Sequence, residues 1–552
     1  NSKSIRSMKC FLIKIFTSIF LITSFSYSQV NTQWKSFYNG SANDTDVVTS
    51  FKVDNTGNVY VTGFSIGSGT GRDFATIKYN SNGQQLWAER YNNPAFNGND
   101  AAAAIEIDNV GNVYVTGRSQ GNETFEDYLT VKYSSEGDQL WVARYNGKGN
   151  DDDIAYAIVL DGLGNVYVTG SSVGKSTSED YVTIKYSPAG DEQWASSYDS
   201  DFGDVDIATS ISLDNSGNII VTGFSIGDGT SEDYATVKYN SLGEELWVTR
   251  YNGSSSSYDI ASALAVDAAG NVYVTGFSYD SLSSEDYATI KYNSSGEEQW
   301  ISKYNGSSNE FDISTAIDVD GAGNVYVTGY SFDSNSSEDY ATIKYNSSGF
   351  QLWVSKYNGS GNDYDIAMAL KTDNNGNVYV TGYSYASVNS EDYATIKYNS
   401  SGEEQWSEIF EDKTNGSDIA NSIEVDGLGN VYVTGYSYEG SSRDDYVTIK
   451  YSQTVGISQN SNTIPVNFIL NQNYPNPFNP KTIINYELPF SNFVSIKVYD
   501  ILGNEVIALV NERQNAGIYS VDWNAVGYPS GVYFYKLETE RFADVKRMLL
   551  IK

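Results

Sequence analysis

Aspartate is the most regularly placed reactive residue type in this chain, and it recurs in three eightfold sets. The first set precedes runs of the DIA type and consists of Asp46, Asp100, Asp153, Asp206, Asp259, Asp312, Asp365 and Asp418. The second set precedes runs of the DYATIKY type and consists of Asp73, Asp127, Asp180, Asp233, Asp286, Asp339, Asp392 and Asp445. The third set lies in DxxGN turns, from Asp54 to Asp426. An aspartate in such a turn commonly accepts hydrogen bonds from the turn backbone, so we interpret the third set as structural.

The first two sets have two interpretations, one structural and one metal-binding. Identical residues in every repeat favour the structural one, in which each carboxylate accepts backbone N–H bonds and holds its loop in place. Calcium is the alternative, because hard cations take several oxygen ligands. Four loops carry paired acids suited to that role: Asp44 with Asp46, Asp151 with Asp153, Asp204 with Asp206, and Asp363 with Asp365. No complete EF-hand loop is present, and calcium therefore stays open as a cofactor.

Histidine and cysteine usage excludes several reaction types. The sequence contains no histidine, and its single cysteine is Cys10 in the predicted leader. Ser-His-Asp and Cys-His mechanisms and ordinary zinc sites are therefore excluded. Catalysis would have to rest on carboxylates, Tyr, Lys or bound calcium, and the repeats single out no acid and base in distinct environments. We therefore expect no catalytic residue.

Aromatic residues are the candidates for ligand recognition. Tryptophans recur once per repeat from Trp87 to Trp406, usually with an aromatic residue four positions later. This regularity favours packing between repeats, because a large ring on one strand face fills the gap to the next sheet. The irregular aromatics are better candidates for ligand binding, since they precede the DIA runs: Phe96, Phe202, Tyr258, Phe311 and Tyr364.

These residues are positioned by an internal repeat with a nearly constant period. The glycine that ends the GNVYVTG motif falls at Gly63, Gly117, Gly170, Gly223, Gly276, Gly329, Gly382 and Gly435. Each copy contains four short runs rich in Val, Ile, Tyr and Thr, separated by turn clusters such as DNNGN and NSSG. Four antiparallel strands per repeat of this length predict a propeller blade. Because strand direction alternates, the first two aspartate sets should share one face of the ring.

The two ends of the repeat region predict how the ring closes. The segment from Trp34 to Gly40 aligns with the fourth strand of a repeat, whereas the last repeat stops after its third strand at Tyr451. We expect the N-terminal strand to pair with that last strand, because otherwise both would expose unpaired edges. The fold class is therefore all-β, with an eight-bladed propeller over residues 29–451.

The motif DxxGNVYVTG followed by DYATIKY resembles the SBBP type of bacterial β-propeller repeat over about residues 34–451. The family name implies seven blades, whereas direct counting gives eight. Residues 465–552, which include NYPNPFNP, VYDILGNEV and the basic end KRMLLIK, resemble the C-terminal sorting domain of type IX secretion. That resemblance implies recognition by the outer-membrane export machinery. Alternating runs and turns in this segment independently predict a small β-sandwich.

The remaining segments predict export. Residues 1–28 combine basic residues, the apolar stretch 15–25 and a small-x-small site, as a signal peptide does. Residues 452–464 are rich in Ser, Gln, Asn and Thr and are expected to be a linker. The chain should therefore pass through the periplasm and outer membrane and be secreted or held at the cell surface.

Charge narrows the choice of partners. The sequence has 34 basic and 69 acidic residues; residues 1–28 hold four basic and no acidic ones, and residues 465–552 hold eight of each. The rest therefore holds 22 basic and 61 acidic residues. Nucleic acid is excluded as a partner, because binding it relies on neutralising phosphates.

Three classes of function remain. The first is a non-catalytic, monomeric binding or adhesion scaffold that recognises an extracellular glycan or protein. The alternatives are a carboxylate-dependent glycosidase or polysaccharide lyase on a propeller scaffold, and a purely structural surface protein. The near identity of the repeats fits the first class and disfavours an enzyme, whereas it hardly separates the first class from a purely structural protein.

Overall fold

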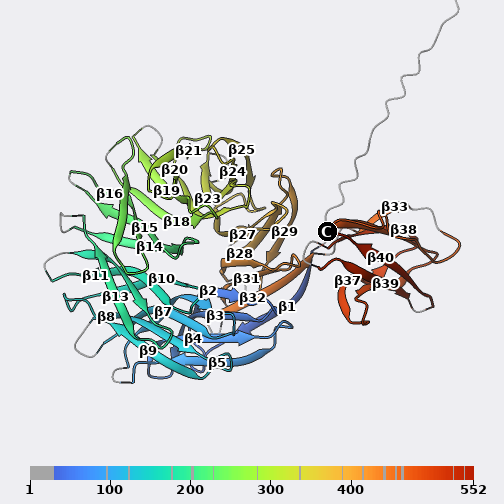
Figure 1. The fold of residues 1–552 in the computed structure, drawn as a ribbon, viewed down its shortest axis with the longest axis horizontal. Helices are drawn as coiled ribbons and strands as arrows, with labels where there is room; N and C mark the ends of the chain where they lie inside the picture. Colours follow the sequence, from blue (N-terminus) through green and yellow to red (C-terminus); the bar gives the residue numbers. More distant parts are fainter. Residues whose placement is uncertain are drawn as a thin grey trace, which may run out of the picture. The chain divides into compact units, whose positions relative to one another are not determined.

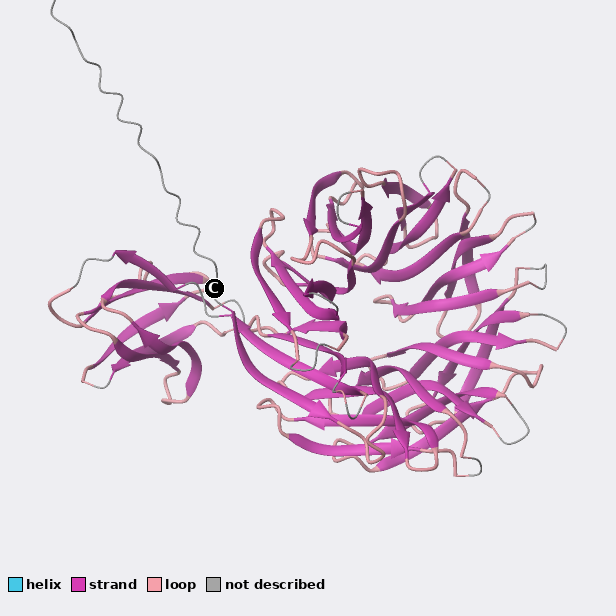
Figure 2. Ribbon diagram, turned by 180° about the vertical axis from the view of Figure 1, so that it is seen from behind, coloured by secondary structure: helices cyan, strands magenta, loops and turns pink. Residues whose placement is uncertain are grey.

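The protein is built from β-strands throughout the part of the chain that the structure describes (Figure 2). The computed structural model describes residues 30–94, 97–121, 125–175, 178–200, 204–227, 229–255, 257–281, 284–334, 337–387, 390–412, 416–438, 440, 443–453, 457–461, 465–525, 528–539 and 541–552. No helix in these ranges is long and apolar enough to cross a membrane. The leader expected in residues 1–28 lies outside them.

Strands β1 to β32 form eight four-stranded antiparallel sheets that follow one another around a ring as propeller blades (Figure 1). Blade 1 contains β2 (Asp46–Val53), β3 (Val59–Gly67), β4 (Gly71–Tyr79) and β5 (Gln85–Tyr91). Blade 2 contains β6 (Asp100–Ile107), β7 (Val113–Gln120), β8 (Glu126–Tyr133) and β9 (Gln139–Tyr145). Blade 3 contains β10 (Asp153–Leu160), β11 (Val166–Val173), β12 (Glu179–Tyr186) and β13 (Glu192–Tyr198). Blade 4 contains β14 (Asp206–Leu213), β15 (Ile219–Ile226), β16 (Glu232–Tyr239) and β17 (Glu245–Tyr251).

The second half of the ring repeats the same plan. Blade 5 contains β18 (Asp259–Val266), β19 (Val272–Asp280), β20 (Ser284–Tyr292) and β21 (Glu298–Tyr304). Blade 6 contains β22 (Asp312–Val319), β23 (Val325–Asp333), β24 (Ser337–Tyr345) and β25 (Gln351–Tyr357). Blade 7 contains β26 (Asp365–Thr372), β27 (Val378–Ser387), β28 (Ser390–Tyr398) and β29 (Glu404–Phe410). Blade 8 contains β30 (Asp418–Val425), β31 (Val431–Tyr438), β32 (Asp444–Gln453) and β1 (Val30–Tyr38).

Blade 8 confirms the predicted closure of the ring and the count of eight. Strand β1 pairs antiparallel with β32, and Trp34 is opposite Lys450 in the register. The Trp34 indole then reaches blade 1, where its Nε1 donates to the carbonyl of Ser81 at 3.0 Å. The N-terminal strand therefore completes the last sheet and also joins it to the first.

Sequence pattern and position within the blade agree. The second and third strands, such as β3 and β4, are mostly buried, whereas the outer strand β5 is mostly half-buried or exposed. Val, Ile, Tyr and Thr suit strands that pack on both faces. The predicted positive φ in the DNNGN turn is also present, since Gly376 has φ 75°.

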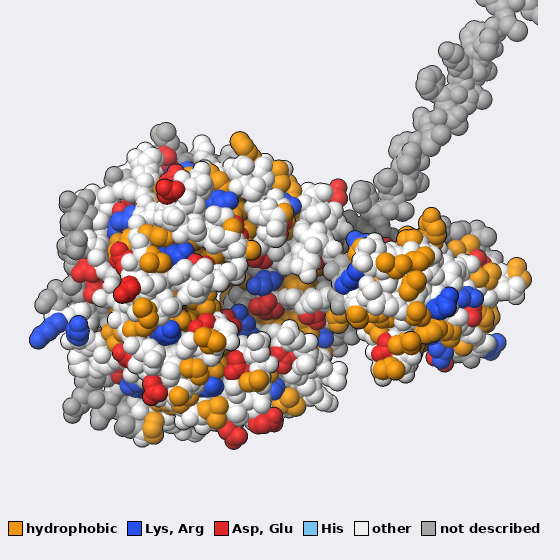
Figure 3. Space-filling model, in the orientation of Figure 1, with side chains coloured by type: hydrophobic (Ala, Val, Ile, Leu, Met, Phe, Trp, Pro, Cys, Tyr) orange, Lys and Arg blue, Asp and Glu red, His pale blue; other side chains and the backbone are white. Residues whose placement is uncertain are grey.

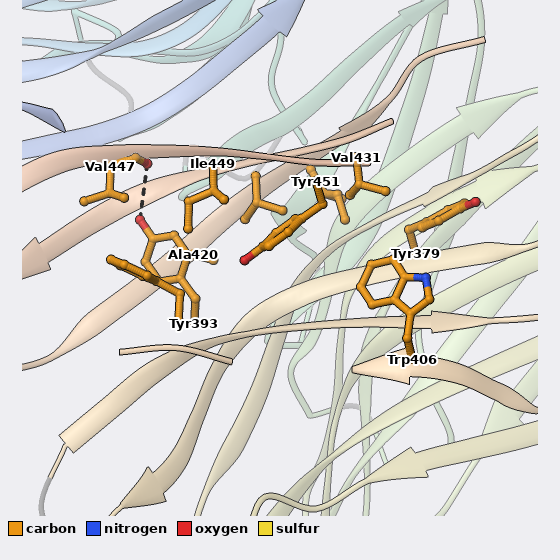
Figure 4. Close-up of a cluster of buried hydrophobic side chains, with 11 residues drawn as sticks. Tyr379, Tyr393, Trp406, Ala420, Val431, Val447, Ile449 and Tyr451 are labelled. Carbon is orange, nitrogen blue, oxygen red and sulfur yellow. Dashed lines mark hydrogen bonds between the residues drawn. The ribbon is translucent and has the colours of Figure 1, made fainter. Parts of the chain in front are cut away.

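Aromatic and aliphatic side chains fill the space between neighbouring blades. Figure 4 shows this layer between blades 7 and 8, where Tyr379, Tyr393 and Trp406 face Val431 and Val447. The Tyr393 hydroxyl donates across the junction to the Val447 carbonyl at 3.3 Å. Each blade therefore buries its faces only against its neighbours in the ring.

The repeated tryptophans lie in these inter-blade layers, as predicted. In blades 1 to 6 the indole Nε1 donates to a carbonyl of the next blade: Trp87 to Ser135, Trp141 to Pro188, Trp194 to Ser241, Trp247 to Ser294, Trp300 to Ser347, and Trp353 to Ser400. These indoles are therefore part of the ring's packing and are not a sugar platform.

A second compact unit includes the described residues from 457 to 525 and from 530 to 552. One of its sheets has the order β33 (Ile457–Ser461), β38 (Gly517–Asn524), β35 (Lys481–Leu488) and β34 (Ile469–Leu470). The other has the order β37 (Glu505–Gln514), β36 (Asn492–Tyr499), β39 (Gly531–Thr539) and β40 (Ala543–Leu550). Buried Trp523 of β38 packs against Tyr533 of β39 with ring centroids 5.3 Å apart. The predicted small β-sandwich is therefore present.

The stretch expected to be a linker, residues 452–464, differs in one respect. Its residues 457–461 form β33, which pairs antiparallel with β38 at the edge of the sandwich. An edge strand is held by backbone hydrogen bonds, which do not require an apolar sequence. The polar composition therefore did not reveal it.

Candidate binding face of the propeller

The first two aspartate sets lie on one face of the ring, as the alternation of strands predicted. In blade 1, Ser65 of β3 is paired with Asp46 of β2 on one side and with Asp73 of β4 on the other. The same pairing recurs in blades 2 to 8. We call this surface the Asp face. It includes the loops that connect each outer strand to the inner strand of the next blade and the loops that connect the second strand to the third strand within a blade.

The inner-strand aspartates hold their preceding loops, which is the contact that the structural interpretation of the first set expects. All eight are at most 1 % exposed. In each, Oδ2 accepts a backbone N–H at 2.5 to 3.1 Å, from Gly40, Asn93, Gly147, Ser200, Gly253, Gly306, Gly359 and Asp412 in chain order. Burial raises the pKa of Asp100, Asp153, Asp206 and Asp365 to about 6.

The third-strand aspartates are held by cations from the outer strand in several blades. Arg90 Nη2 lies 2.7 Å from Asp73 Oδ2, and Arg144 Nη1 lies 2.7 Å from Asp127 Oδ2. In blade 4, Arg250 Nη2 lies 2.9 Å from Asp233 Oδ2. These ion pairs offset part of the charge of the buried carboxylates.

The DxxGN aspartates have the structural role that the sequence predicted for them. Asp54 Oδ1 accepts the backbone N–H of Thr56 at 2.8 Å and that of Asn58 at 2.9 Å. Its Oδ2 accepts the Tyr60 hydroxyl at 3.2 Å. Burial acts to raise the pKa of Asp54, but the hydrogen bonds from Thr56 and Asn58 outweigh it and lower the pKa.

The acids paired in sequence for calcium differ in burial within each pair. Asp46, Asp153, Asp206 and Asp365 are buried at the starts of inner strands, whereas their partners Asp44, Asp151, Asp204 and Asp363 lie nearer the surface. Asp44 contacts Arg443 at 3.0 Å. Asp151 and Asp363 each accept the backbone N–H of the next residue.

Within the residues that the structure describes, one group of three carboxylates gathers, and it combines Asp206 with Asp180 and Asp199. Asp199 was not a candidate from the sequence. The signal that could have found it is its place in the repeat, because most other copies have asparagine there.

Three of the aromatic candidates pack against their own blades. Tyr258 lies 5.3 Å from Tyr279 between ring centroids, Phe311 lies 5.5 Å from Phe332, and Tyr364 lies 5.3 Å from Tyr385. All three are half-buried. The structure does not bring them together, since they belong to blades 5, 6 and 7. Phe96 and Phe202 lie outside the described residues.

A cavity of about 420 Å³ opens where the inner strands of blades 1 to 4 begin. Its lining is mostly apolar, with small residues of β6 and the aromatic rings of Phe64 and Tyr156. Arg118 is the charged residue of the lining, and its Nε lies 3.2 Å from Glu126 Oε2. An apolar pocket with a few convergent polar groups is the usual form of a ligand site.

Two residues of this cavity depart from the repeat and were missed by sequence reasoning. Tyr156 is the fourth residue of its inner strand, where other blades have mostly Thr, Ala or Ser. Arg118 follows the VTG motif, where most blades have Phe or Tyr. Figure 3 shows the mixed surface of one side of the propeller, with acidic side chains spread among hydrophobic ones.

Comparison with known families confirms both resemblances found in the sequence. Residues 140–175 and 405–440 match the model of the SBBP β-propeller repeat. Residues 472–552 match the model of the secretion system C-terminal sorting domain.

More distant similarities exist to longer proteins. An uncharacterised WD repeat-containing protein of Acanthamoeba polyphaga mimivirus is 22% identical over an alignment of 457 residues, and the match covers 62% of this chain and 32% of that protein. The chain thus spans about a third of that relative's length. PorZ, described as a surface component of the type IX secretion system of Porphyromonas gingivalis, is 14% identical with a TM-score of 0.38, covering 90% of this chain and 64% of PorZ.

The α-L-arabinofuranosidase arb93a of Fusarium graminearum is 7% identical with a TM-score of 0.34, covering 76% of this chain and 97% of that enzyme. Similarity at these TM-scores does not bear on the activity of this protein. The sequence matches do identify the parts: this chain is a propeller of SBBP-type repeats followed by a secretion-system sorting domain.

Proposed function

We propose that the protein is an exported, non-catalytic propeller that binds an extracellular glycan or protein at the Asp-face cavity of blades 1 to 4. The observation that supports this most is the cavity itself, because it is confined to one side of a nearly symmetric ring. A symmetric scaffold without a ligand would not need Tyr156 and Arg118 at positions where most blades are alike.

The second part of the proposal concerns the C-terminal sandwich. We propose that residues 465–552 direct the chain through the type IX machinery to the cell surface or the medium. The match to the sorting-domain model supports export. Deleting residues 465–552 in the native host should leave the propeller in the periplasm, and its appearance on the cell surface or in the medium would contradict this.

An enzymatic role is less well supported by the carboxylates. Asp392 has the properties that an acid catalyst would need, because burial, followed by Glu411 and Asp418, raises its pKa to about 7. However, Asp392 is only 1 % exposed. A sugar ring cannot contact a carboxylate that has no accessible surface, so we propose a structural role for this group.

The test is a glycan array and a panel of cell-envelope proteins probed with the full chain, followed by titration of any ligand found. Tyr156→Ala should weaken binding about tenfold, because it removes an aromatic contact worth about 1.4 kcal/mol. Met368→Ala is the matched control, since Met368 holds the same strand position in blade 7 and both side chains are 37% exposed. Equal affinities of the Tyr156→Ala chain and the wild type would contradict the site.

If neither the array nor the panel yields a ligand, the alternative of a purely structural surface protein is favoured. Turnover of any bound glycan by the wild-type chain would instead favour the glycosidase or lyase alternative.

A further inference from the structure

Most boundaries between two blades have the same arrangement of charged groups on the Asp face. The third-strand aspartate of one blade lies near the inner-strand aspartate of the next, as shown by Asp127, which raises the pKa of Asp153. The next-to-last residue of the outer strand faces the same region, and Arg144 holds this position in blade 2. We call such a place a junction and name it by its blades, so that this one is junction 2/3.

Junction 3/4 departs from this arrangement at two positions. Ser197 stands where Arg144 stands in blade 2, as the register shows: Val182 pairs with Ser197 in blade 3, and Leu129 pairs with Arg144 in blade 2. Two residues later in the sequence, Asp199 occupies the position that Asn146 has in blade 2. One cation has been exchanged for a neutral side chain, and one acid has been added.

The acids of junction 3/4 come together in space. Asp180, Asp199 and Asp206 each place a carboxylate oxygen so that the three oxygens lie within 4.8 Å of one another. They come from β12, from the connection after β13 and from the start of β14. Asp199 is half-buried, so the group lies within reach of solvent.

The innermost acid of the group is incompletely satisfied. Asp206 is 0% exposed, and its Oδ2 accepts the backbone N–H of Ser200 at 3.1 Å. Its Oδ1 receives no hydrogen bond of normal geometry from the described part of the chain, as is also true of the inner-strand aspartates of the other blades. Two more buried oxygens of the same corner, Asp199 Oδ1 and Ser200 Oγ, likewise have no hydrogen-bond partner among the described residues.

Such an arrangement is costly without a counterion. Buried carboxylates close to one another disfavour the charged form, and a buried polar atom without a partner costs free energy. A bound cation removes both costs at once. Calcium fits these donors, because it takes 6–8 oxygen ligands at 2.3–2.6 Å, which allows ligand oxygens to lie up to about 5 Å apart.

We propose that junction 3/4 is a calcium site, held by Asp180, Asp199 and Asp206 with Ser200 Oγ and water completing the shell. The cation takes the place that arginine holds at junction 2/3. This inference is independent of the proposed ligand site in the cavity, because the two are tested by different variants and different probes.

The test is calorimetric titration of the full chain, freed of metal by a chelator, with calcium chloride. The wild type should bind calcium, and both Asp199→Asn and Ser197→Arg should lose one equivalent. Ser197→Arg introduces only the residue type found in sister blades, so it should fold, and the far-UV spectrum checks this. Asn146→Asp at junction 2/3 is the matched control, and it should gain no site because Arg144 is still present.

A gain of function makes the test stricter. The double variant Arg144→Ser with Asn146→Asp copies junction 3/4 into junction 2/3 and should bind one additional calcium ion. Unchanged calcium stoichiometry in folded Asp199→Asn and Ser197→Arg chains would overturn the proposal. Absence of any heat of binding in the wild type at millimolar calcium would also overturn it.

Discussion

Junctions 2/3 and 3/4 have equivalent strands in the same register and an equivalent buried inner-strand aspartate, yet they differ in charge. At junction 2/3, Arg144 lies 2.7 Å from Asp127 and an asparagine follows in the loop. At junction 3/4, serine and aspartate occupy the two corresponding positions, and three carboxylate oxygens gather. The loop conformation tolerates this change in side-chain charge, because the inner-strand aspartate accepts the equivalent backbone hydrogen bond at both junctions.

The difference shows how a repeat protein can acquire a site without changing its fold. Residues common to all blades, such as the inner aspartates, provide loop anchoring, whereas departures at one blade provide local chemistry. Junction 7/8 has a related departure, with Ile409 at the position of the cation and Glu411 at the position of the asparagine. Asp392 of that junction accordingly has a pKa raised to about 7, by burial first and then by Glu411.

The largest expected effect concerns the closure on which every junction depends. Deleting residues 29–40 removes β1 and exposes the edge of β32. We expect a loss of more than about 5 kcal/mol in the unfolding free energy of the propeller, because removal of a single buried aromatic already costs about 3–5 kcal/mol. Chemical denaturation followed by tryptophan fluorescence measures this.

The control for the closure is a deletion of residues 454–464, which removes β33 from the other compact unit. The propeller transition should then stay where it is in the wild type. Equal losses from the two deletions would show that β1 does not hold the ring closed.

The next largest effect is expected at junction 2/3. Arg144→Ser leaves Asp127 without its ion pair in a buried position and should destabilise the chain by about 2 kcal/mol, less than for a fully buried pair because the arginine is half-exposed. Urea denaturation in the presence of a chelator measures the change. Arg118→Ser, whose ion pair with Glu126 is more exposed, serves as the control and should cost less than half as much. If the Arg144→Ser chain is as stable as the wild type, the ion pair between Arg144 and Asp127 does not contribute to the free energy of unfolding.

The pH dependence should separate the two junctions further. Asp206 has a pKa of about 6 against an ordinary value of 3.8, first because of burial; Asp199 and Asp180 also raise it, while Ser225 and the Ser200 amide lower it. Between the unfolded pKa of 3.8 and the folded pKa of about 6, the folded state therefore holds more protons than the unfolded state, and stability falls as pH rises through this window. The chelated chain should be more stable at about pH 5.5 than at about pH 7.5.

Saturating calcium should reduce that slope in the wild type, because the metal binds the deprotonated carboxylates. In the Asp199→Asn chain, calcium should leave the slope unchanged. The remaining slope comes from other buried aspartates, among them Asp100, Asp153 and Asp365 with pKa values of about 6 and Asp392 with a pKa of about 7. Thermal melts at several pH values measure all three slopes, and a chelated chain that is less stable at the lower pH would contradict the assignment.

The repeat made most of the fold predictable, whereas the site required the structure. A fixed period with four short runs led to the blades, and an unmatched strand at each end led to the closure. The group of Asp180, Asp199 and Asp206 was not predictable in the same way, because its members come from three segments that only the junction brings together. Proximity in sequence instead suggested Asp204 as the partner of Asp206, although Asp204 is exposed and outside the group.

The aromatic candidates show the same limit. Their irregular positions in the loops suggested free platforms, but Tyr258, Phe311 and Tyr364 each lie against an aromatic residue at the end of the second strand of the same blade. Neither position alone predicts this packing; only their joint pattern does, because both are aromatic in blades 5, 6 and 7. Departures from the repeat in the inner strand, such as Tyr156, were the better signal.

The smallest expected effect is also the one that distinguishes the two junctions most directly. Ser197→Arg gives junction 3/4 the cation of junction 2/3, and without calcium it should stabilise the chain by about 1 kcal/mol or less, as a partly exposed ion pair does. With calcium at about 100 times its Kd, the wild type should gain about 2.7 kcal/mol from binding, whereas the variant should gain nothing at this site. The Ser197→Arg chain should therefore be the more stable one in chelator and the wild type the more stable one in calcium, because arginine and calcium compete for the same carboxylates. If the same chain is the more stable one in both conditions, arginine and calcium do not compete for these carboxylates.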